Sequence, residues 1–374
     1  MINRKFFKII VSAIVLGVLL SSCSSSAGTA SSWPGFSISD GKGYFAYGSQ
    51  IFALEDKNGS LLWQYPEEAS AGRQFYAAPE VSGNLVVVGD YTNTLAALDK
   101  QSGKEKWQFT DADDRYIGSA LMAGGKVFAP NTDHNLYALD ENGNLLWRFK
   151  AAGPNWTKPV ADEQNLYLAS MDHFVYALNF DYSDSALEAD KDGNRNLVSA
   201  PVWSVDLGAA VAANPVISEG ILYAGTIDGH LYAIDLAGRE IKWSFNGDGT
   251  VASIWGSPVV TANAVFFGDE DGNVYALDKM NGKALWDSPF AAGSPVISGG
   301  VAIDGKVAFA SNAGKIFTID ENKDPKTLVT LEATLYSPLG FDTDKILVAP
   351  ASKDKYFLAL NADGNEIWSY YPAK

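Results

Sequence analysis

One pattern of hydrophobic and polar residues recurs along this chain about every forty residues. In Leu231–Phe245 (LYAIDLAGREIKWSF), a mostly apolar segment leads into a polar turn with a glycine, and a second segment follows that carries a tryptophan. Apolar side chains on both faces of the first segment are typical of a strand buried between two layers. A glycine in the turn can adopt the positive φ that a tight hairpin requires. The motif therefore predicts a hairpin whose second strand holds the tryptophan.

The motif occurs eight times. Six copies end on a tryptophan at the expected distance, a seventh reaches its tryptophan only after an insertion, and one copy has a valine in its place: Trp63, Trp107, Trp147, Trp243, Trp286, Trp368; Trp203; Val329. Further apolar segments precede each hairpin. In the second copy the four predicted strands are Pro79–Val81, Leu85–Gly89, Thr94–Asp99 and Glu105–Phe109. Four short strands in about forty residues make one propeller blade. The sequence thus predicts an all-β, eight-bladed β-propeller of four-stranded antiparallel blades over residues 33–374.

The two ends of the repeated region predict how the ring is assembled. The innermost strand of blade one can begin at Trp33–Phe36, and the chain ends just after the outer strand that holds Trp368. We therefore expect each blade to be built from consecutive strands, without a strand exchanged between the two ends of the chain. No segment has a convincing helical period.

The first residues predict a targeting segment. Residues 1–22 contain Arg4, Lys5 and Lys8 followed by an apolar run of twelve residues, too short to span a bilayer comfortably. Leu20–Cys23 (LSSC) then resembles the lipobox of bacterial lipoproteins, and Cys23 is the only cysteine of the chain. That resemblance implies a signal peptide over 1–22, palmitate or a similar acyl chain on Cys23, and a flexible tether over 23–32. An ordinary secretory signal or a single membrane anchor are the alternatives.

The same resemblance implies a location outside the cytoplasm. Ser24, rather than aspartate, follows the cysteine. By the sorting rules of bacterial lipoproteins, this implies the outer membrane in a cell with two membranes and the cell surface otherwise.

Charge excludes one class of partner. The formal net charge is −16, and it becomes −19 once the three basic residues of 1–22 are removed. A strongly acidic surface repels phosphates, so we expect no nucleic-acid partner.

The repeated residues G-x-[LV]-Y-A-[LI]-D-x-x-x-G-x-x-x-W resemble the pyrroloquinoline quinone (PQQ) type of propeller repeat over residues 33–370. Quinoprotein dehydrogenases of that family place a vicinal cysteine pair over the quinone. This chain has one cysteine, within the lipobox, so we expect neither PQQ nor enzymatic activity. Resemblance to the lipoproteins of the same repeat implies an envelope-anchored scaffold that binds other envelope proteins, as in outer-membrane assembly. An extracytoplasmic propeller that binds a glycan or small molecule is the alternative.

Aromatic residues stand just before the innermost strand of six blades: Trp33, Tyr76, Tyr116, Trp156, Trp255 and Tyr336. Such residues could surround the mouth of the central channel and form a candidate surface for a partner or ligand, because interfaces are enriched in aromatic rings. The alternative is that they pack between neighbouring blades.

Two further patterns concern metal ions. The insertion of blade four, Phe180–Pro201, contains Glu188, Asp190, Asp192 and Asn196 around a glycine, which approximates a calcium-binding loop. The alternative is a solvated acidic loop, since Ser199 stands where an EF-hand has its bidentate glutamate. The three histidines, in contrast, fall in equivalent loops of different blades: His134, His173 and His230. A ring holds such loops apart, so we expect them to form turns rather than a metal site.

Overall fold

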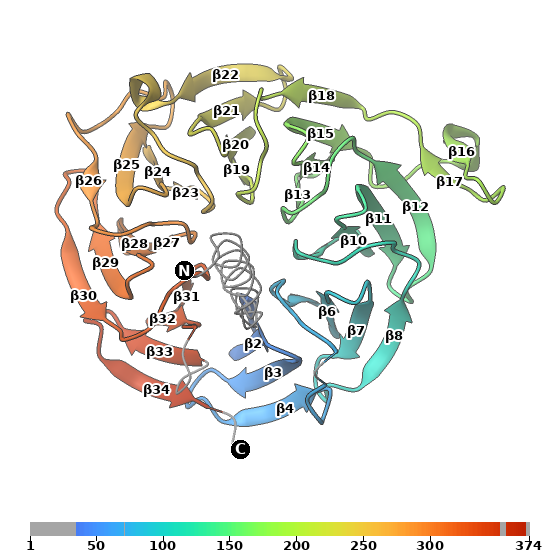
Figure 1. Cartoon of the computed structure of the whole chain (residues 1–374), viewed down its shortest axis with the longest axis horizontal. Helices are drawn as coiled ribbons and strands as arrows, with labels where there is room; N and C mark the ends of the chain where they lie inside the picture. The colour runs from blue at the N-terminus through green and yellow to red at the C-terminus, as the bar shows by residue number, and fades with distance from the viewer. Residues whose placement is uncertain (1–34, 71, 352–356, 372–374) are drawn as a thin grey trace, which may run out of the picture. The chain divides into compact units, whose positions relative to one another are not determined.

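The computed structural model describes residues 35–70, 72–351 and 357–371. These residues form eight sheets arranged in a ring, and the four strands of each blade are antiparallel, with the first of them nearest the centre (Figure 1). The predicted eight-bladed propeller is therefore confirmed. Cys23 and Trp33 lie outside the described residues.

The strands follow one another from the inside of each blade outward. In the first four blades they are, for blade one, β1 (Gly35–Ser39), β2 (Lys42–Tyr47), β3 (Gln50–Glu55) and β4 (Leu61–Tyr65); for blade two, β5 (Glu80–Ser82), β6 (Leu85–Gly89), β7 (Leu95–Asp99) and β8 (Glu105–Phe109); for blade three, β9 (Leu121–Ala123), β10 (Lys126–Pro130), β11 (Asn135–Asp140) and β12 (Leu145–Lys150); and for blade four, β13 (Val160–Ala161), β14 (Leu166–Ala169), β15 (Phe174–Leu178) and β18 (Trp203–Asp206). The strands predicted for blade two begin and end within one residue of those observed.

The second half of the ring repeats this plan. Its strands are, for blade five, β19 (Val216–Ser218), β20 (Ile221–Gly225), β21 (Leu231–Asp235) and β22 (Glu240–Phe245); for blade six, β23 (Val259–Val260), β24 (Ala264–Gly268), β25 (Asn273–Asp278) and β26 (Phe290–Ala291); for blade seven, β27 (Val301–Ile303), β28 (Lys306–Ala310), β29 (Lys315–Ile319) and β30 (Lys326–Thr330); and for blade eight, β31 (Gly340–Asp342), β32 (Lys345–Val348), β33 (Phe357–Asn361) and β34 (Glu366–Tyr370). Blades one and eight each use four consecutive strands, so no described strand is exchanged between the two ends of the repeated region, as predicted. Blade four is the exception to consecutive order, because β16 and β17 intervene between β15 and β18. A short 3₁₀ helix, η2 (Gly247–Gly249), follows blade five.

The insertion of blade four adds strands to its neighbour. After the 3₁₀ helix η1 (Asp184–Ala186), the hairpin of β16 (Leu187–Ala189) and β17 (Arg195–Val198) joins the outer edge of blade three, with β17 parallel to β12. Figure 1 shows this hairpin outside the ring, beyond β12. Leu187 and Val198 are buried in the core that blades three and four share. The hairpin therefore covers the backbone edge of β12, which would otherwise be open for pairing.

Tryptophan and glycine join one blade to the next. The Trp63 indole lies over Gly103 of blade two, where an added Cβ would be 2.6 Å from the ring, and its Nε1–H donates to the carbonyl of Lys100 at 3.0 Å. The same indole donation to the following blade is made by Trp107, Trp147, Trp243, Trp286 and Trp368, at 2.7–3.2 Å. The turn glycine predicted for hairpin geometry thus has a second role, because only a residue without a side chain leaves room for the indole.

Two blades depart from the pattern. In blade six the outer strand β26 begins four residues after Trp286, because the chain bends over residues 285–288 and Pro289 has no N–H to donate to a ladder. In blade seven a bulge displaces the register, and Leu328, not Val329, contacts the corresponding turn glycine, Gly364. The outer strand predicted at Trp286 is therefore displaced, whereas Val329 lies in the outer strand of blade seven, β30, as predicted, but does not take the packing position of a tryptophan.

Blade eight closes the ring on blade one. The rings of Phe45 and Phe357 stack at 4.8 Å, and the Trp368 indole donates to the carbonyl of Asp56 at 2.7 Å. The ammonium of Lys345 also pairs with the buried Asp56 carboxylate at 2.7 Å. Within the described part of the chain, no helix is long and apolar enough to cross a membrane.

Candidate functional site

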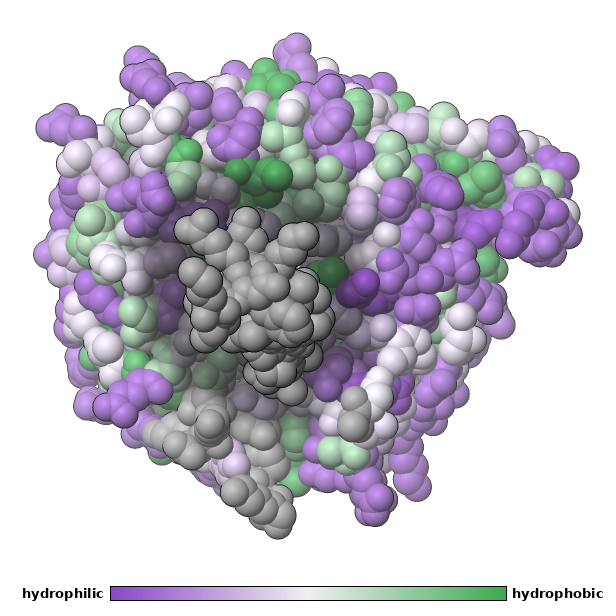
Figure 2. Space-filling model, in the orientation of Figure 1, coloured by the Kyte–Doolittle hydropathy of each residue, from purple (hydrophilic) through white to green (hydrophobic). Residues whose placement is uncertain are grey.

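One end of the ring carries a cavity of about 470 Å³ at the mouth of the channel, called the mouth cavity below. In a four-stranded meander, the loop between the second and third strands lies at the same end as the linker to the next blade. Both kinds of segment line the mouth cavity, for example Trp255 from a linker and Glu270 from a loop. Figure 2 shows one face of the ring, with hydrophilic residues over most of its periphery.

The registers of the innermost strands align the linkers with one another. In each aligned linker, one residue is buried between blades and the next residue faces the mouth cavity. The first position is buried between blades at 0–1% exposure in the linkers before blades two to eight: Phe75, Tyr116, Asn155, Val211, Ile254, Val296 and Leu335. The second position lines the mouth cavity: Tyr76, Ile117, Trp156, Ala212, Trp255, Ile297 and Tyr336. We call the second set the mouth positions.

This alignment sorts the predicted aromatic residues. Tyr76, Trp156, Trp255 and Tyr336 all lie at mouth positions. Tyr116 does not, because it is only 1% exposed and packs in the core of blades two and three. It is excluded from the candidate surface.

The burial of Tyr116 depends on a residue of the neighbouring blade. Gly89 of blade two gives it room, since an added Cβ there would lie 2.3 Å from Tyr116. Ile117, one residue later, takes the mouth position of blade three. Both residues are apolar in part, so the sequence offered no signal for which of the two faces the channel.

The mouth positions follow a regular order. From blade two to blade eight they read Tyr, Ile, Trp, Ala, Trp, Ile, Tyr. Aromatic rings therefore come from every second blade, and the smallest side chain, Ala212, lies between the two tryptophans. We call Tyr76, Trp156, Trp255 and Tyr336 the aromatic box.

The aromatic box shares the cavity with neutral polar side chains and with a single charged one. The indole of Trp255 donates to the Glu270 carboxylate at 3.5 Å, and the ring of Tyr76 lies 4.0 Å from that of Tyr91. Burial raises the pKa of the Tyr76 hydroxyl, so this side chain is neutral at physiological pH. Glu270 is the one charged side chain among the described residues that line the cavity.

The end of the ring around the mouth cavity is acidic. Its described linkers and second-to-third-strand loops contain fourteen acidic and three basic side chains. The three basic ones are all paired with carboxylates: Arg73 with Asp90 at 2.6 Å, Lys158 with Glu80 at 2.6 Å, and Arg115 with Asp114 at 3.3 Å. This end of the molecule therefore presents an excess of negative charge to an approaching partner.

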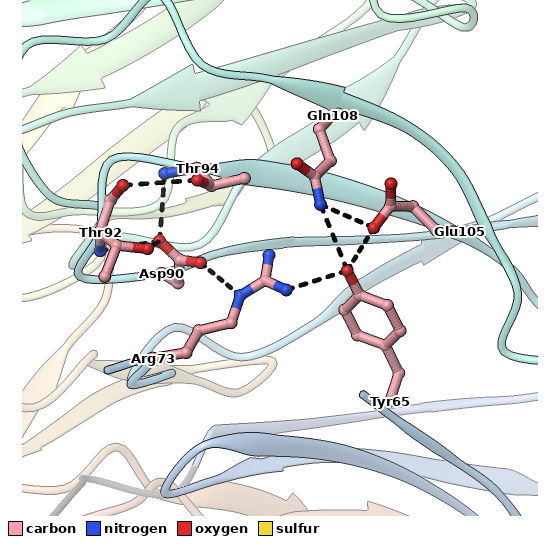
Figure 3. A network of polar contacts seen from close by, with 7 residues as sticks. All are labelled: Tyr65, Arg73, Asp90, Thr92, Thr94, Glu105 and Gln108. Atoms are coloured by element: carbon pink, nitrogen blue, oxygen red, sulfur yellow. Dashed lines mark hydrogen bonds and ion pairs between the residues drawn. The ribbon is translucent and has the colours of Figure 1, made fainter. Parts of the chain in front are cut away.

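The ion pair of Arg73 and Asp90 is supported by further hydrogen bonds on both partners. Its Nε donates to the fully buried carboxylate of Asp90, and its Nη1 donates to the Tyr65 hydroxyl at 2.9 Å (Figure 3). The other oxygen of Asp90 accepts the backbone N–H groups of Thr92 and Thr94 at 2.8 and 3.0 Å. Because Arg73 is held by both the Asp90 carboxylate and the Tyr65 hydroxyl, the pair fixes the linker from blade one to blade two rather than offering a free cation.

The predicted calcium loop is the turn of the β16–β17 hairpin. One oxygen of Asp190 accepts the backbone N–H groups of Asp192 and Asn194 at 3.0 and 2.8 Å, and Asn196 donates to the other at 3.3 Å. The hydrogen bond from Asn194 is the main reason that the pKa of Asp190 is lowered. Among the described residues, no group of three or more His, Cys, Asp and Glu side chains could hold a metal ion. Calcium binding through Glu188, Asp190, Asp192 and Asn196 stays a prediction.

The histidines have the turn role that their spacing predicts. His134 and His173 adopt positive φ values of 78° and 70°, and Gly229, with φ of 82°, takes that place before His230. His173 contacts Asp206 at 2.8 Å through Nδ1, and His230 contacts Asn246 at 3.1 Å through Nε2.

Comparison with known proteins identifies the family. A family model described as "Outer membrane protein assembly factor BamB" matches residues 21–119, 115–193 and 199–370. The chain belongs to the BamB family. Its PQQ-type repeat and its propeller fold agree with that assignment.

Individual BamB relatives are distant. The factor from Bordetella pertussis is 23% identical over 194 residues, which cover 52% of this chain and 46% of the relative. A serine/threonine-protein kinase, AfsK of Streptomyces griseus, is 27% identical over 52% of this chain and only 22% of the kinase. The chain thus matches less than half the length of these curated relatives.

Solved structures resemble the fold over more of its length. BamB from Moraxella catarrhalis has a TM-score of 0.68 at 19% identity, covering 87% of this chain and 92% of that one. The computationally designed protein Ika8 has a TM-score of 0.66 at 15% identity, covering 92% and 98%. At these identities the likeness concerns the fold alone.

Proposed function

We propose that this protein is a scaffold that binds other proteins of the cell envelope during outer-membrane protein assembly, with the mouth cavity as its docking surface. Family membership supports the process, since the family is described as an outer-membrane assembly factor. The observation that carries the docking surface is the aromatic box, set in an acidic end of the ring. Tryptophan and tyrosine in a partly buried pocket are the side chains that most often dominate binding energy at protein interfaces.

Anchoring to the membrane is part of this proposal. Cys23→Ala should abolish labelling of the protein by radioactive palmitate and release it from the membrane fraction, because the variant lacks the acylated thiol. A second variant, Ser24→Asp, keeps the cysteine and should remain labelled while moving to the inner membrane of a two-membrane cell. Labelling of the Cys23→Ala protein would contradict lipidation at this residue.

Capture of a partner tests the scaffold. Tagged wild-type protein, incubated with detergent extract of the envelope, should capture an outer-membrane barrel protein of the assembly machinery. The Trp156→Ala, Trp255→Ala double variant should lose this partner, at a cost of about 2 kcal/mol or more for each hot-spot ring. Ile241→Ala is the control, since Ile241 is 39% exposed on an outer strand far from the mouth positions in the fold.

The melting temperature of the double variant separates a lost docking surface from a destabilised fold. If the double variant melts at the wild-type temperature and loses the partner, the mouth cavity is the docking surface. If it melts earlier, the two rings act in packing. Capture that is equal for wild type and double variant contradicts docking at the mouth cavity.

A small-molecule or glycan binder is the second candidate. A cavity of about 470 Å³ falls in the range of small-ligand sites, and aromatic rings are suited to sugar faces. Maltotetraose that quenches tryptophan fluorescence in wild type, but not in the double variant, would favour this function over the scaffold.

A further inference from the structure

The aromatic box has a geometry that is more specific than a ring of hydrophobic residues. Tyr76, Trp156, Trp255 and Tyr336 come from blades two, four, six and eight, so that in a ring of eight blades they stand about a quarter turn apart. Isoleucine or alanine separates them at the described blades in between. Four rings therefore surround one cavity from four sides, with Ala212 leaving space between the two tryptophans.

Charge distinguishes this cavity from a general apolar pocket. Glu270 lines it beside Trp255, at 3.5 Å from the indole Nε1, and no basic side chain is found among its described lining residues. The surrounding linkers and loops add an excess of acidic side chains whose few basic neighbours are already paired. The electrostatic field of these carboxylates does not favour a neutral ligand. A cation would be stabilised by both the Glu270 carboxylate and the π faces of the aromatic rings.

We propose that the aromatic box binds a cationic side chain, arginine in preference to lysine, presented by an extended segment of a partner protein. The inference rests on the proposed function, because it names the chemistry of the partner at the same docking surface. A guanidinium group is planar, so it can stack on an indole and still donate hydrogen bonds to a carboxylate such as Glu270. A volume of about 470 Å³ admits a few residues of a chain rather than a folded domain.

Direct titration tests the cation. Tryptophan fluorescence or calorimetry of the full-length protein is followed with acetylated, amidated tetra-arginine, and with the tetra-lysine and tetra-glutamine peptides of the same design. The arginine peptide should bind more tightly than the lysine peptide, and the glutamine peptide should bind at least about tenfold more weakly than the arginine peptide. Equal affinity for the arginine and glutamine peptides would overturn the proposal, and so would binding of maltotetraose in preference to both.

Two adjacent acids provide a matched pair of variants. Glu270 lines the cavity, whereas Asp271 is exposed on the same loop and does not line it. Glu270→Gln and Asp271→Asn change the net charge equally, so unspecific attraction to an acidic protein falls equally in both. Glu270→Gln should weaken the arginine peptide by about tenfold, and Asp271→Asn by less than about twofold. Equal effects would show that only the overall charge of the protein is sensed.

The π faces need their own variant. Trp255→Leu keeps an apolar side chain in the cavity and removes the ring, so it should weaken the arginine peptide by roughly three- to tenfold. A melting curve controls for folding, and Glu270→Gln, an exposed position, remains informative if the leucine variant is unstable. No loss of affinity in a stable Trp255→Leu protein would contradict a role for the ring.

The outcomes also separate this inference from the proposed function. If the envelope partner is captured equally by wild type and by Glu270→Gln, and the peptides do not distinguish the two, the scaffold stands and cation binding fails. If the arginine peptide binds as expected while wild type captures no envelope protein, cation binding stands and the assembly role fails.

Discussion

At the scale of single residues, stability rests on an indole of one blade placed over a glycine of the next. Trp243 is half-buried, donates to the carbonyl of Lys279 at 3.2 Å, and lies over Gly282. The ring therefore contributes hydrophobic burial and satisfies a backbone acceptor with the same side chain. Because this contact joins two blades, its loss weakens a boundary rather than a single sheet.

Truncation of the indole gives the first expectation. Trp243→Ala should lower the free energy of unfolding by about 3 kcal/mol, measured by urea denaturation, because it leaves a cavity between blades five and six. Lys242→Ala, an exposed neighbour on the same strand, is the control and should change it by less than about 0.5 kcal/mol. A small effect of both substitutions would show that the indole is not a packing residue.

The glycine partner can be tested separately from its backbone angle. Gly282 and Gly41 have similar φ values, 71° and 69°, but an added Cβ would lie 2.6 Å from the Trp243 ring at the first and would meet nothing at the second. Gly41→Ala should cost about 1–2 kcal/mol from its left-handed backbone. Gly282→Ala should cost clearly more, because the indole must also move. Equal costs would show that glycine serves only the turn.

Buried tyrosines set the response to alkali. Burial raises the pKa of Tyr44 and Tyr223 to about 12, and neither hydroxyl has a hydrogen-bond partner among the described residues. Above pH 10 the unfolded chain ionises these groups while the folded chain does not. The stability of the fold should therefore fall between about pH 10 and 12.

A tyrosine variant tests this response. Tyr223→Phe should leave the melting temperature at pH 7 unchanged or slightly raised, since it removes a buried hydroxyl without a partner. The same variant should lose less stability than wild type between pH 9 and pH 11.5. Parallel losses in both proteins would contradict a contribution of this hydroxyl.

At the scale of elements, the hairpin β16–β17 shows how an insertion can be used structurally. It originates in blade four but extends the sheet of blade three, and its Leu187 and Val198 are buried at 4% exposure. Of the acidic residues that suggest calcium, Asp190 and Asp192 lie in the turn of this hairpin, where Asp190 already accepts backbone N–H groups, and Glu188 lies in β16. The turn therefore has a complete explanation in hairpin geometry, and calcium would have to bind in addition.

Calcium can be tested on the hairpin directly. If the loop binds the ion, 1 mM calcium should raise the melting temperature of chelator-treated wild type by the mass-action effect of a native-state ligand. The Asp190→Ala, Asp192→Ala double variant should show no such rise. The single variant Asp190→Ala should melt earlier even without calcium, because its turn acceptor is gone. An unchanged wild-type curve would leave the structural role alone.

At the scale of the whole molecule, the closing contact between blades eight and one holds the ring together without an exchanged strand. The buried carboxylate of Asp56 pairs with Lys345 at 2.7 Å, and the lysine side chain is 14% exposed. Lys345 also contacts Asp344 at 3.4 Å, but that carboxylate is 75% exposed. The two ion pairs share one cation and differ in burial, so they should differ in their contribution to stability.

Removal of each carboxylate compares the two pairs. Asp56→Ala should lower the free energy of unfolding by about 1–3 kcal/mol, because a largely buried ammonium loses its partner. Asp344→Ala should change it by less than about 0.5 kcal/mol, as expected for an exposed pair. Hydrogen exchange of β33 and β34 should rise in the first variant alone. Equal effects would show that the closing contact does not depend on this pair.

Sequence alone determined the features that repeat. Eight copies of one apolar and polar pattern determined the number of blades and the tryptophan of the outer strand in six of them, because a blade can bury its two faces only against similar neighbours. The aromatic residues before the inner strands were also recognised at Tyr76, Trp156, Trp255 and Tyr336, since each stands beside a regular strand.

Only the tertiary structure decided the positions that depart from the repeat and the cavity that forms when the blades close into a ring. Tyr116 and Ile117 could not be told apart in sequence, because burial between blades is set by Gly89 of another blade. Similarly, the hairpin of blade four joins blade three, and Leu328 replaces Val329, through a backbone pairing and a bulge that leave no compositional signal. The mouth cavity, too, exists only once seven linkers meet around one axis. Contacts between residues far apart in the chain place these side chains, whereas local periodicity records only the strand in which each residue lies.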